Sequence, residues 1–156
     1  MEGVVIQASA ILTHAEGTGR QFVVTTGSGH HLIVDDAVGA TGAKPIELVA
    51  AALAGCTAFD VINILRKKRQ RVTGYEVLVE ADQPSDPPQV FTKVRIRHIV
   101  IGVDVDTGAV ESAIHLSETK YCSVGAMVQK TASFETTFEV IPADVAEVVA
   151  AEVQGQ

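Results

Sequence analysis

The sequence predicts an α+β protein that forms a single domain over residues 1–156. Three observations support this prediction. The first third of the chain alternates in the manner of strands, one long proline-free stretch after Pro45 has helical character, and strand-like alternation returns afterwards. With 156 residues, of which 47% are hydrophobic, the chain has the size of one domain and can bury a sizeable core.

The first third is interpreted as a three-stranded meander. Its apolar residues run from Val4 to Ile11, from Phe22 to Thr25 and from His31 to Val34. Two glycine-containing segments, 17–19 and 27–29, separate these runs and supply the turns.

The long helix is expected from Pro45 to about Lys68, because proline favours the first helical position and Gly55 is the only glycine inside this range. Its apolar residues go nearly all the way round: Ile46, Leu48, Val49, Leu53, Phe59, Val61, Ile62, Ile64 and Leu65. A surface helix needs only one apolar stripe. We therefore expect this helix to be buried on most sides, which favours a partner subunit as well as a sheet and predicts a homodimer.

The second half adds strands and shorter helices in the order β-β-α-α-β-α. The strand expected at 91–101 alternates, so that Val94, Ile96, His98 and Val100 share one buried face. The remaining elements are a strand at 75–81, helices at 110–121 and 123–130, a strand at 133–140 and a short C-terminal helix at 143–154.

Charge and hydropathy exclude several classes of partner. The net charge is −7, and the one basic cluster, Arg66 to Arg71, falls at the end of the long helix, where the helix dipole favours cations. No nucleic-acid partner is expected. A signal peptide and a run of about 20 uninterrupted apolar residues are both absent from the sequence as given, which predicts a soluble, cytoplasmic protein without a membrane partner.

Two cysteines are the candidate chemical groups, because intracellular chains of this size need no disulfide framework. Cys56 lies among small residues in the middle of the long helix. Taken alone, it is as well explained as a small buried hydrophobe. Cys122 falls at the expected start of a short helix, where backbone N–H groups lower a thiol pKa, so electrostatics alone would make it the more reactive of the two.

A buried helix-centre cysteine and a distant helix-start cysteine suggest a peroxidatic and resolving pair. In such a pair a thiolate attacks peroxide, becomes a sulfenic acid and condenses with the second thiol to a disulfide. Spacing alone does not establish that Cys56 and Cys122 meet.

Two segments together resemble the paired-cysteine signature of the OsmC/Ohr family: residues 44–56, which end in Ala54-Gly55-Cys56, and residues 120–124, Lys-Tyr-Cys-Ser-Val. The resemblance implies antiparallel sheets packed around a long buried helix in an intertwined homodimer. It also implies reduction of organic hydroperoxides, with Cys56 attacking, Cys122 resolving and an external thiol restoring the reduced state. No metal or organic cofactor is implied.

The family resemblance further implies an arginine that holds the thiolate and an acid that orients the arginine. Arg20 is the only arginine before residue 66, and its alternative role is that of a solvent-exposed arginine at a hairpin end. The best-characterised members carry the acid directly after the proline, where this chain has Ile46, and Glu47 follows one residue later. In this respect the sequence resembles a less characterised subgroup of OsmC-like proteins. Glu47 would lie opposite Cys56 on an ideal helix, so its alternative role is compensation of the helix dipole.

Asp60 complicates the electrostatics, since a carboxylate four residues after Cys56 lies on the same helix face and would raise its thiol pKa. A buried carboxyl needs a partner, and the candidates are His30, His31, His98 and His115. No C-x₂-C zinc spacing and no dinucleotide or phosphate-binding glycine motif is present.

Two functions therefore compete. The first is a cysteine-dependent peroxidase for organic hydroperoxides. The second is a non-catalytic dimer that binds a small molecule or senses redox state, which the isoleucine at position 46 favours. A purely structural dimer would leave the helix-start position of Cys122 unexplained.

Overall fold

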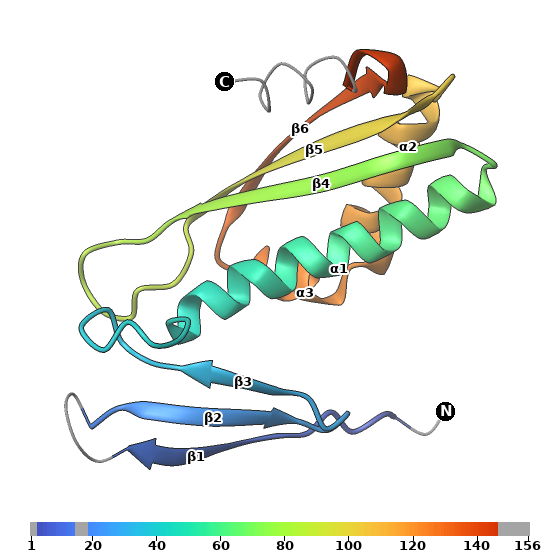
Figure 1. Cartoon of the computed structure of the whole chain (residues 1–156). Coiled ribbons are helices and arrows are strands. Elements are labelled where there is room, and N and C mark those ends of the chain that lie inside the picture. Colours follow the sequence, from blue (N-terminus) through green and yellow to red (C-terminus); the bar gives the residue numbers. More distant parts are fainter. Residues whose placement is uncertain (1–2, 15–18, 147–156) are drawn as a thin grey trace, which may run out of the picture. The chain divides into compact units, whose positions relative to one another are not determined.

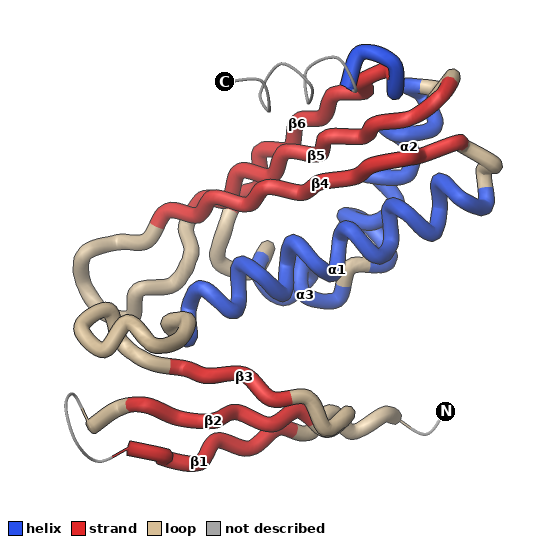
Figure 2. Tube along the Cα trace, in the orientation of Figure 1, coloured by secondary structure: helices blue, strands red, loops and turns tan. Residues whose placement is uncertain are grey.

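The computed structural model describes residues 3–14 and 19–146, and the chain divides into two compact units, Met1–Val49 and Ala50–Gln156 (Figure 1). Each unit holds its own three-stranded sheet, as the secondary structure in Figure 2 shows. The class is therefore α+β, as predicted. Of the C-terminal helix expected at 143–154, residues 143–146 are helical and the remainder lies outside the described residues.

The first unit contains the meander, with β1 (Ala8–His14), β2 (Gln21–Thr26) and β3 (His31–Val34) paired antiparallel in that order. The turn between β2 and β3 contains Gly29, whose φ of 83° is a conformation that glycine adopts without strain. Strand β1 starts later than predicted, because Val4 and Ile6 precede it and are exposed.

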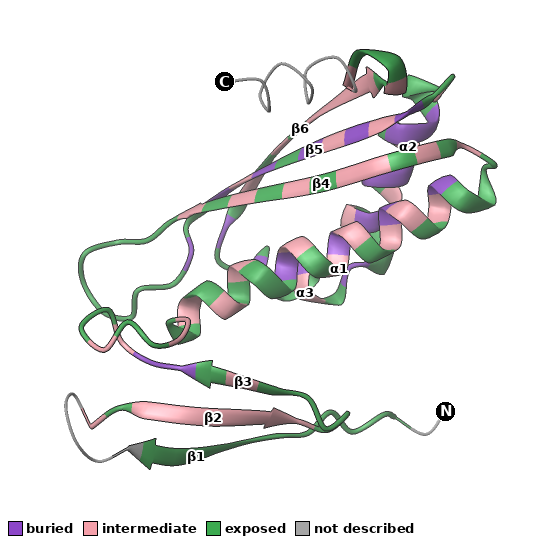
Figure 3. Ribbon diagram, in the orientation of Figure 1, coloured by how far each residue is buried: buried purple, intermediate pink, exposed green. Residues whose placement is uncertain are grey.

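Helix α1 (Pro45–Lys67) begins and ends with the residues that helix termini favour. Proline occupies its first position, Glu47 accepts a hydrogen bond from the Lys44 backbone N–H, and basic side chains occupy the last turn. Within one chain, however, only one stripe of α1 is buried (Figure 3), at Leu53, Thr57, Val61 and Leu65. Burial on most sides is not found in the single chain.

The second unit contains β4 (Arg71–Asp82), β5 (Lys93–Val103) and β6 (Ser133–Pro142). Strands β4 and β5 pair antiparallel, but β5 and β6 pair parallel, so the prediction of antiparallel sheets is wrong for this sheet. The parallel pairing follows from the segment that connects β5 to β6. Helices separate β5 from β6, and such a crossover returns the chain in the same direction, whereas a hairpin reverses it.

That crossover consists of α2 (Thr107–Leu116), a π-helical turn η1 (Ser117–Tyr121) and α3 (Ser123–Val128). Apolar side chains from α1, β5 and α2 form the core of the second unit: Val61, Leu65, Val100, Ala109, Val110, Ala113 and Ile114. The predicted alternation of β5 is confirmed, since Val94, Ile96, His98 and Val100 are all buried.

Helix α1 is also long and apolar enough to cross a bilayer by length and composition alone, with a mean hydropathy of 1.9 over its most apolar window. Glu47 and Asp60 interrupt its apolar residues, so the helix is not a run of about 20 uninterrupted apolar residues. The core helix of a soluble protein passes the same test, so the property is weak evidence for a membrane span.

Candidate functional site

Helix α1 presents Cys56 and Asp60 on one face, because residues four apart are neighbours on a helix. Both side chains are half-buried. Thr57, between them in sequence, belongs to the buried stripe that holds α1 in the second unit. The helix therefore fixes the thiol and the carboxyl as a pair.

Cys122 is positioned by the π-helical turn η1. Its backbone N–H donates to the Ser117 carbonyl at 2.9 Å, the i to i−5 bond that defines this turn, and its extended backbone then ends the turn. Turns of this kind occur frequently at functional sites. Because of this wider turn, Cys122 lies at the N-cap of α3.

The Cys122 thiol is subject to two opposing influences. Its Sγ accepts a hydrogen bond from the Gly125 N–H at 3.2 Å, as the predicted helix-start position requires. The residue is only 5% exposed, however, and this burial, together with the hydrogen bond to Cys56 and the nearby acidic groups, raises the Cys122 pKa to about 12. The expectation that the helix start lowers the Cys122 pKa is wrong, because the effect of desolvation outweighs that of the hydrogen bond from Gly125.

The structure brings the two cysteines and Asp60 together. The two Sγ atoms and one carboxylate oxygen of Asp60 all lie within 4.8 Å of one another, although Cys122 is far from α1 in the sequence. Ser117, which is fully buried, donates from Oγ to Asp60 Oδ2 at 3.1 Å and lies 3.2 Å from Thr57 Oγ1. The pair of thiols thus has a carboxyl held beside it.

The two other candidate residues make local contacts in the first unit. The Arg20 guanidinium, whose side chain is 70% exposed, lies 2.7 Å from Asp36 Oδ2. Glu47 accepts from the Lys44 N–H at 2.9 Å and pairs with its ammonium group, and the backbone hydrogen bond lowers the Glu47 pKa. This contact fits the alternative role of Glu47 at the helix start.

Sequence reasoning missed the hydroxyl groups of Thr57 and Ser117. It expected a histidine beside Asp60, but the partner that the structure gives is Ser117. His98 instead lies fully buried in β5, where its Nδ1 is 2.7 Å from the Tyr75 hydroxyl. A serine inside an apparently continuous helical segment gives no sequence signal, because its role depends on the π-helical turn.

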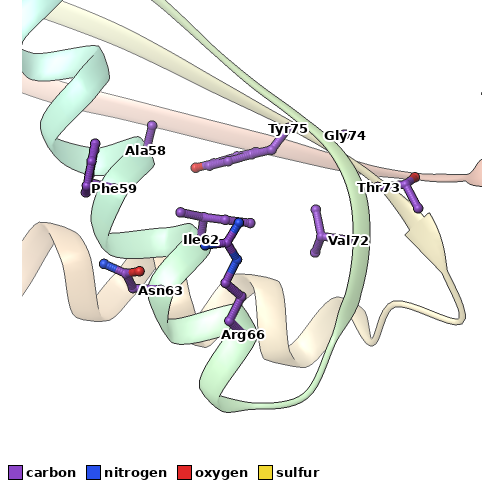
Figure 4. Close-up of a pocket in the computed structure, with 9 residues that line it drawn as sticks. All are labelled: Ala58, Phe59, Ile62, Asn63, Arg66, Val72, Thr73, Gly74 and Tyr75. Carbon is purple, nitrogen blue, oxygen red and sulfur yellow. The ribbon is translucent and has the colours of Figure 1, made fainter.

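Two hollows adjoin α1 in the second unit. In the first, about 470 Å³ in volume, Figure 4 shows Ile62 and Arg66 from α1 opposite Val72 and Tyr75 from the start of β4. The second, about 410 Å³, is lined by Asp60 and by Tyr121, which precedes Cys122. Asp60 is therefore the member of the cysteine cluster that lines a hollow.

The fold and the site define an α+β protein with two reduced cysteines brought side by side between a long helix and a π-helical turn. The chain belongs to the OsmC-like family, whose model matches residues 38–137. Proteins of this family are soluble, so the apolar composition of α1 does not indicate a membrane protein.

Relatives and solved structures agree with this assignment. Protein YhfA of Escherichia coli strain K12 is 37% identical over 125 residues, covering 80% of this chain and 93% of that protein. A hypothetical protein of Aquifex aeolicus VF5 is similar in structure, with a TM-score of 0.79 at 27% identity over 91% of this chain and 98% of the other.

An organic hydroperoxide resistance protein OsmC of Legionella pneumophila has a TM-score of 0.64 at 14% identity, over 90% of this chain and the whole of the other. At this identity the similarity shows the fold alone.

Proposed function

We propose that the protein is a cytoplasmic, thiol-dependent peroxidase that reduces organic hydroperoxides, with Cys56 attacking and Cys122 resolving. The observation that carries the proposal is the approach of the two Sγ atoms to within 4.8 Å. The proposal takes its substrate class from solved proteins of the same fold that are described as organic hydroperoxide resistance proteins.

The chemistry needs only the two cysteines and an external reductant. The Cys56 thiolate attacks the peroxide, the O–O bond breaks, and the alkoxide leaves as the alcohol after taking up a proton, so that Cys56 becomes a sulfenic acid. Cys122 then attacks the Cys56 sulfur and displaces water, and a disulfide forms. An external dithiol reduces this disulfide by exchange.

Accessibility supports the assignment of roles. Cys56 is half-buried and Cys122 is nearly fully buried, so a substrate reaches Cys56 more readily. At neutral pH Cys122 keeps its proton, because burial raises its pKa to about 12. To form a disulfide, the two sulfurs need to close from at most 4.8 Å to about 2.05 Å.

The decisive experiment measures free thiols after addition of an alkyl hydroperoxide, with hydrogen peroxide in parallel. Wild type should lose two thiols and form one disulfide. Cys122→Ser should consume one equivalent and accumulate a trappable sulfenic acid at Cys56, and Cys56→Ser should consume none. If Cys56→Ser reacts normally and Cys122→Ser is inert, the roles are inverted.

The second candidate function is a non-catalytic dimer that binds a small molecule or senses redox state. Glu47 favours it, because this acid is engaged by Lys44 at the helix start and Ile46 occupies the position where the resemblance places an acid. If the alkyl hydroperoxide oxidises the protein's thiols no faster than it oxidises a free thiol such as glutathione, this candidate is favoured over the peroxidase.

A further inference from the structure

Three ligand-type atoms converge between α1 and the start of α3. The two cysteine sulfurs and an Asp60 carboxylate oxygen lie within 4.8 Å of one another. Thiolate sulfur and carboxylate oxygen are both zinc ligands, and a pair of thiolates favours zinc and other soft cations over magnesium or calcium. The sequence suggests the cysteine pair and places Asp60 on the helix face of Cys56, but it does not predict a metal site, because these residues are not in a C-x₂-C arrangement.

Each member of the cluster is held by a neighbouring group. Helix α1 fixes Cys56 and Asp60 one turn apart, and the fully buried Ser117 hydroxyl donates to Asp60 Oδ2. The Gly125 N–H holds Cys122 Sγ. Hydrogen bonds that orient ligands in this way are typical of protein metal sites and tune their affinity.

The negative charges that the cluster can carry also favour binding of a cation. Deprotonation would place up to three negative charges in a half-buried space, and among the described residues no ion pair involves Asp60. A bound divalent cation would remove this repulsion, because it favours the deprotonated forms of all three ligands.

We propose that the reduced protein binds one thiophilic divalent cation, Zn²⁺ in the first place, through Cys56, Cys122 and Asp60. A tetrahedral site with Zn–S bonds of about 2.3 Å separates two thiolates by about 3.8 Å, so the sulfurs need to move by no more than about 1 Å. The fourth position is open to water. The hollow of about 410 Å³ that Asp60 lines gives an approach to the site.

Metal binding and thiol oxidation exclude each other. Binding releases the two thiol protons and changes no oxidation state, and each bound thiolate donates one electron pair to the metal, which makes its sulfur a weaker nucleophile. Disulfide formation removes two of the three ligands and releases the cation. The metal site uses the residues of the proposed peroxidase, but its existence does not require peroxidase activity.

The test uses the full-length chain, reduced with a phosphine, freed of metal and kept from oxygen. Zn²⁺ is titrated in competition with a chromophoric chelator, and Cd²⁺ is titrated while the thiolate-to-metal absorption in the ultraviolet is recorded. We expect one equivalent of either ion to bind. Cys56→Ser and Cys122→Ser should each lower the affinity at least a hundredfold and halve the absorption at saturating Cd²⁺.

Asp60→Asn should weaken Zn²⁺ binding about ten- to hundredfold while retaining the Cd²⁺ absorption, whereas the control Glu111→Gln, an exposed carboxylate on α2, should bind as wild type does. A second test needs no substitution, since wild type oxidised to the disulfide with diamide should lose binding and regain it on reduction. Equal Zn²⁺ affinity in the cysteine variants, or in reduced and oxidised wild type, would overturn the proposal. Both assays contain no peroxide, so an inactive peroxidase would leave their outcome unchanged.

Discussion

At the scale of single residues, the Cys122 thiol changes its environment during the proposed reaction. Burial, the hydrogen bond to Cys56 and the charge of Cys56 all raise the Cys122 pKa. When Cys56 becomes a sulfenic acid, which is neutral, its negative charge disappears and that contribution to the raised pKa is lost. Cys122 therefore loses its proton more easily at the stage where it has to attack Cys56.

Arg20 is the first residue to test, because its role rests on the family resemblance. Its guanidinium is 70% exposed and pairs with Asp36, and exposed ion pairs contribute at most about 1 kcal/mol to stability. We predict that Arg20→Ala slows formation of the Cys56 sulfenic acid about a hundredfold, the lower end of the effect of removing one charge-stabilising donor, and leaves the chain folded. Stopped-flow competition with an alkyl hydroperoxide measures the rate.

Arg97→Ala is the matched control, since this arginine is also exposed and pairs with Glu139 in the second sheet. Equal rates for Arg20→Ala and wild type would assign Arg20 the alternative role of a hairpin-end arginine. Loss of folding in Arg20→Ala would show a structural role instead.

His98 makes the stability of the fold sensitive to acid. Burial lowers the His98 pKa from 6.5 to about 4, so the folded chain keeps the ring neutral at pH values where the unfolded chain protonates it. The neutral ring therefore contributes its full stabilisation above pH 6.5, and this contribution is lost as the pH falls towards 4. The free energy of unfolding should fall by up to about 3 kcal/mol over this range.

Urea unfolding between pH 7 and pH 4 checks this prediction. His98→Gln keeps a polar partner for the Tyr75 hydroxyl but does not titrate, so its stability should fall less steeply than that of wild type. His115→Gln, at an exposed position of the same unit, should follow the wild-type curve. Parallel curves for wild type and His98→Gln would contradict the prediction.

The sequence indicated the two cysteines as a pair, but their electrostatics depended on burial, which no local pattern contains. The predicted N-cap position of Cys122 is confirmed, yet desolvation outweighs the N-cap hydrogen bond and raises the Cys122 pKa. The partner of Asp60 was also missed. Ser117 reaches it only because the π-helical turn brings that serine against α1.

At the scale of elements, periodicity predicted what one strand or helix can show by itself. The buried face of β5 followed from its alternation, and α1 followed from Pro45 and its apolar content. The direction of β6 could not be predicted, because a strand alternates in the same way in a parallel and in an antiparallel pair. The sequence predicts residues 117–121 as a continuation of α2, because hydrogen bonds to residue i−4 and to residue i−5 require no different sequence pattern in so short a segment.

Helix α3 offers a test of how Cys122 is held. A Cβ added at Gly125 would lie 3.2 Å from Cys122 Sγ and 3.4 Å from Cys122 Cβ, so the thiol would have to shift by a few tenths of an ångström. We predict that Gly125→Ala leaves sulfenic acid formation at Cys56 unchanged and slows the following disulfide formation several-fold. Rapid quenching with a thiol-alkylating reagent separates the two steps.

Met127→Ala is the control on the same helix, because Met127 is 65% exposed. It should form the disulfide at the wild-type rate. A Gly125→Ala variant that resolves as quickly as wild type would show that the position of Cys122 Sγ does not limit the second step.

At the scale of the whole molecule, only one stripe of α1 is buried within the chain, although apolar residues lie on nearly every side of the helix. Its exposed residues include Ala51, Ala52, Gly55 and Phe59. Phe59 is 74% exposed and lines the hollow in Figure 4. A Cβ at Gly55 would meet no atom within 4 Å. Small residues beside an exposed aromatic ring permit close approach of another surface, and aromatic side chains are common anchors of interfaces.

We therefore predict a homodimer in which this face of α1 is covered by the partner subunit. Phe59→Lys should convert the dimer to a monomer at micromolar concentration, because it replaces an apolar anchor by a charge that the interface would have to desolvate. Val103→Lys introduces the same charge at another exposed apolar position of the second unit and should remain dimeric. Multi-angle light scattering after gel filtration gives the mass of each variant. A monomeric wild type would contradict the prediction, and a dimeric Phe59→Lys would place the interface on another face.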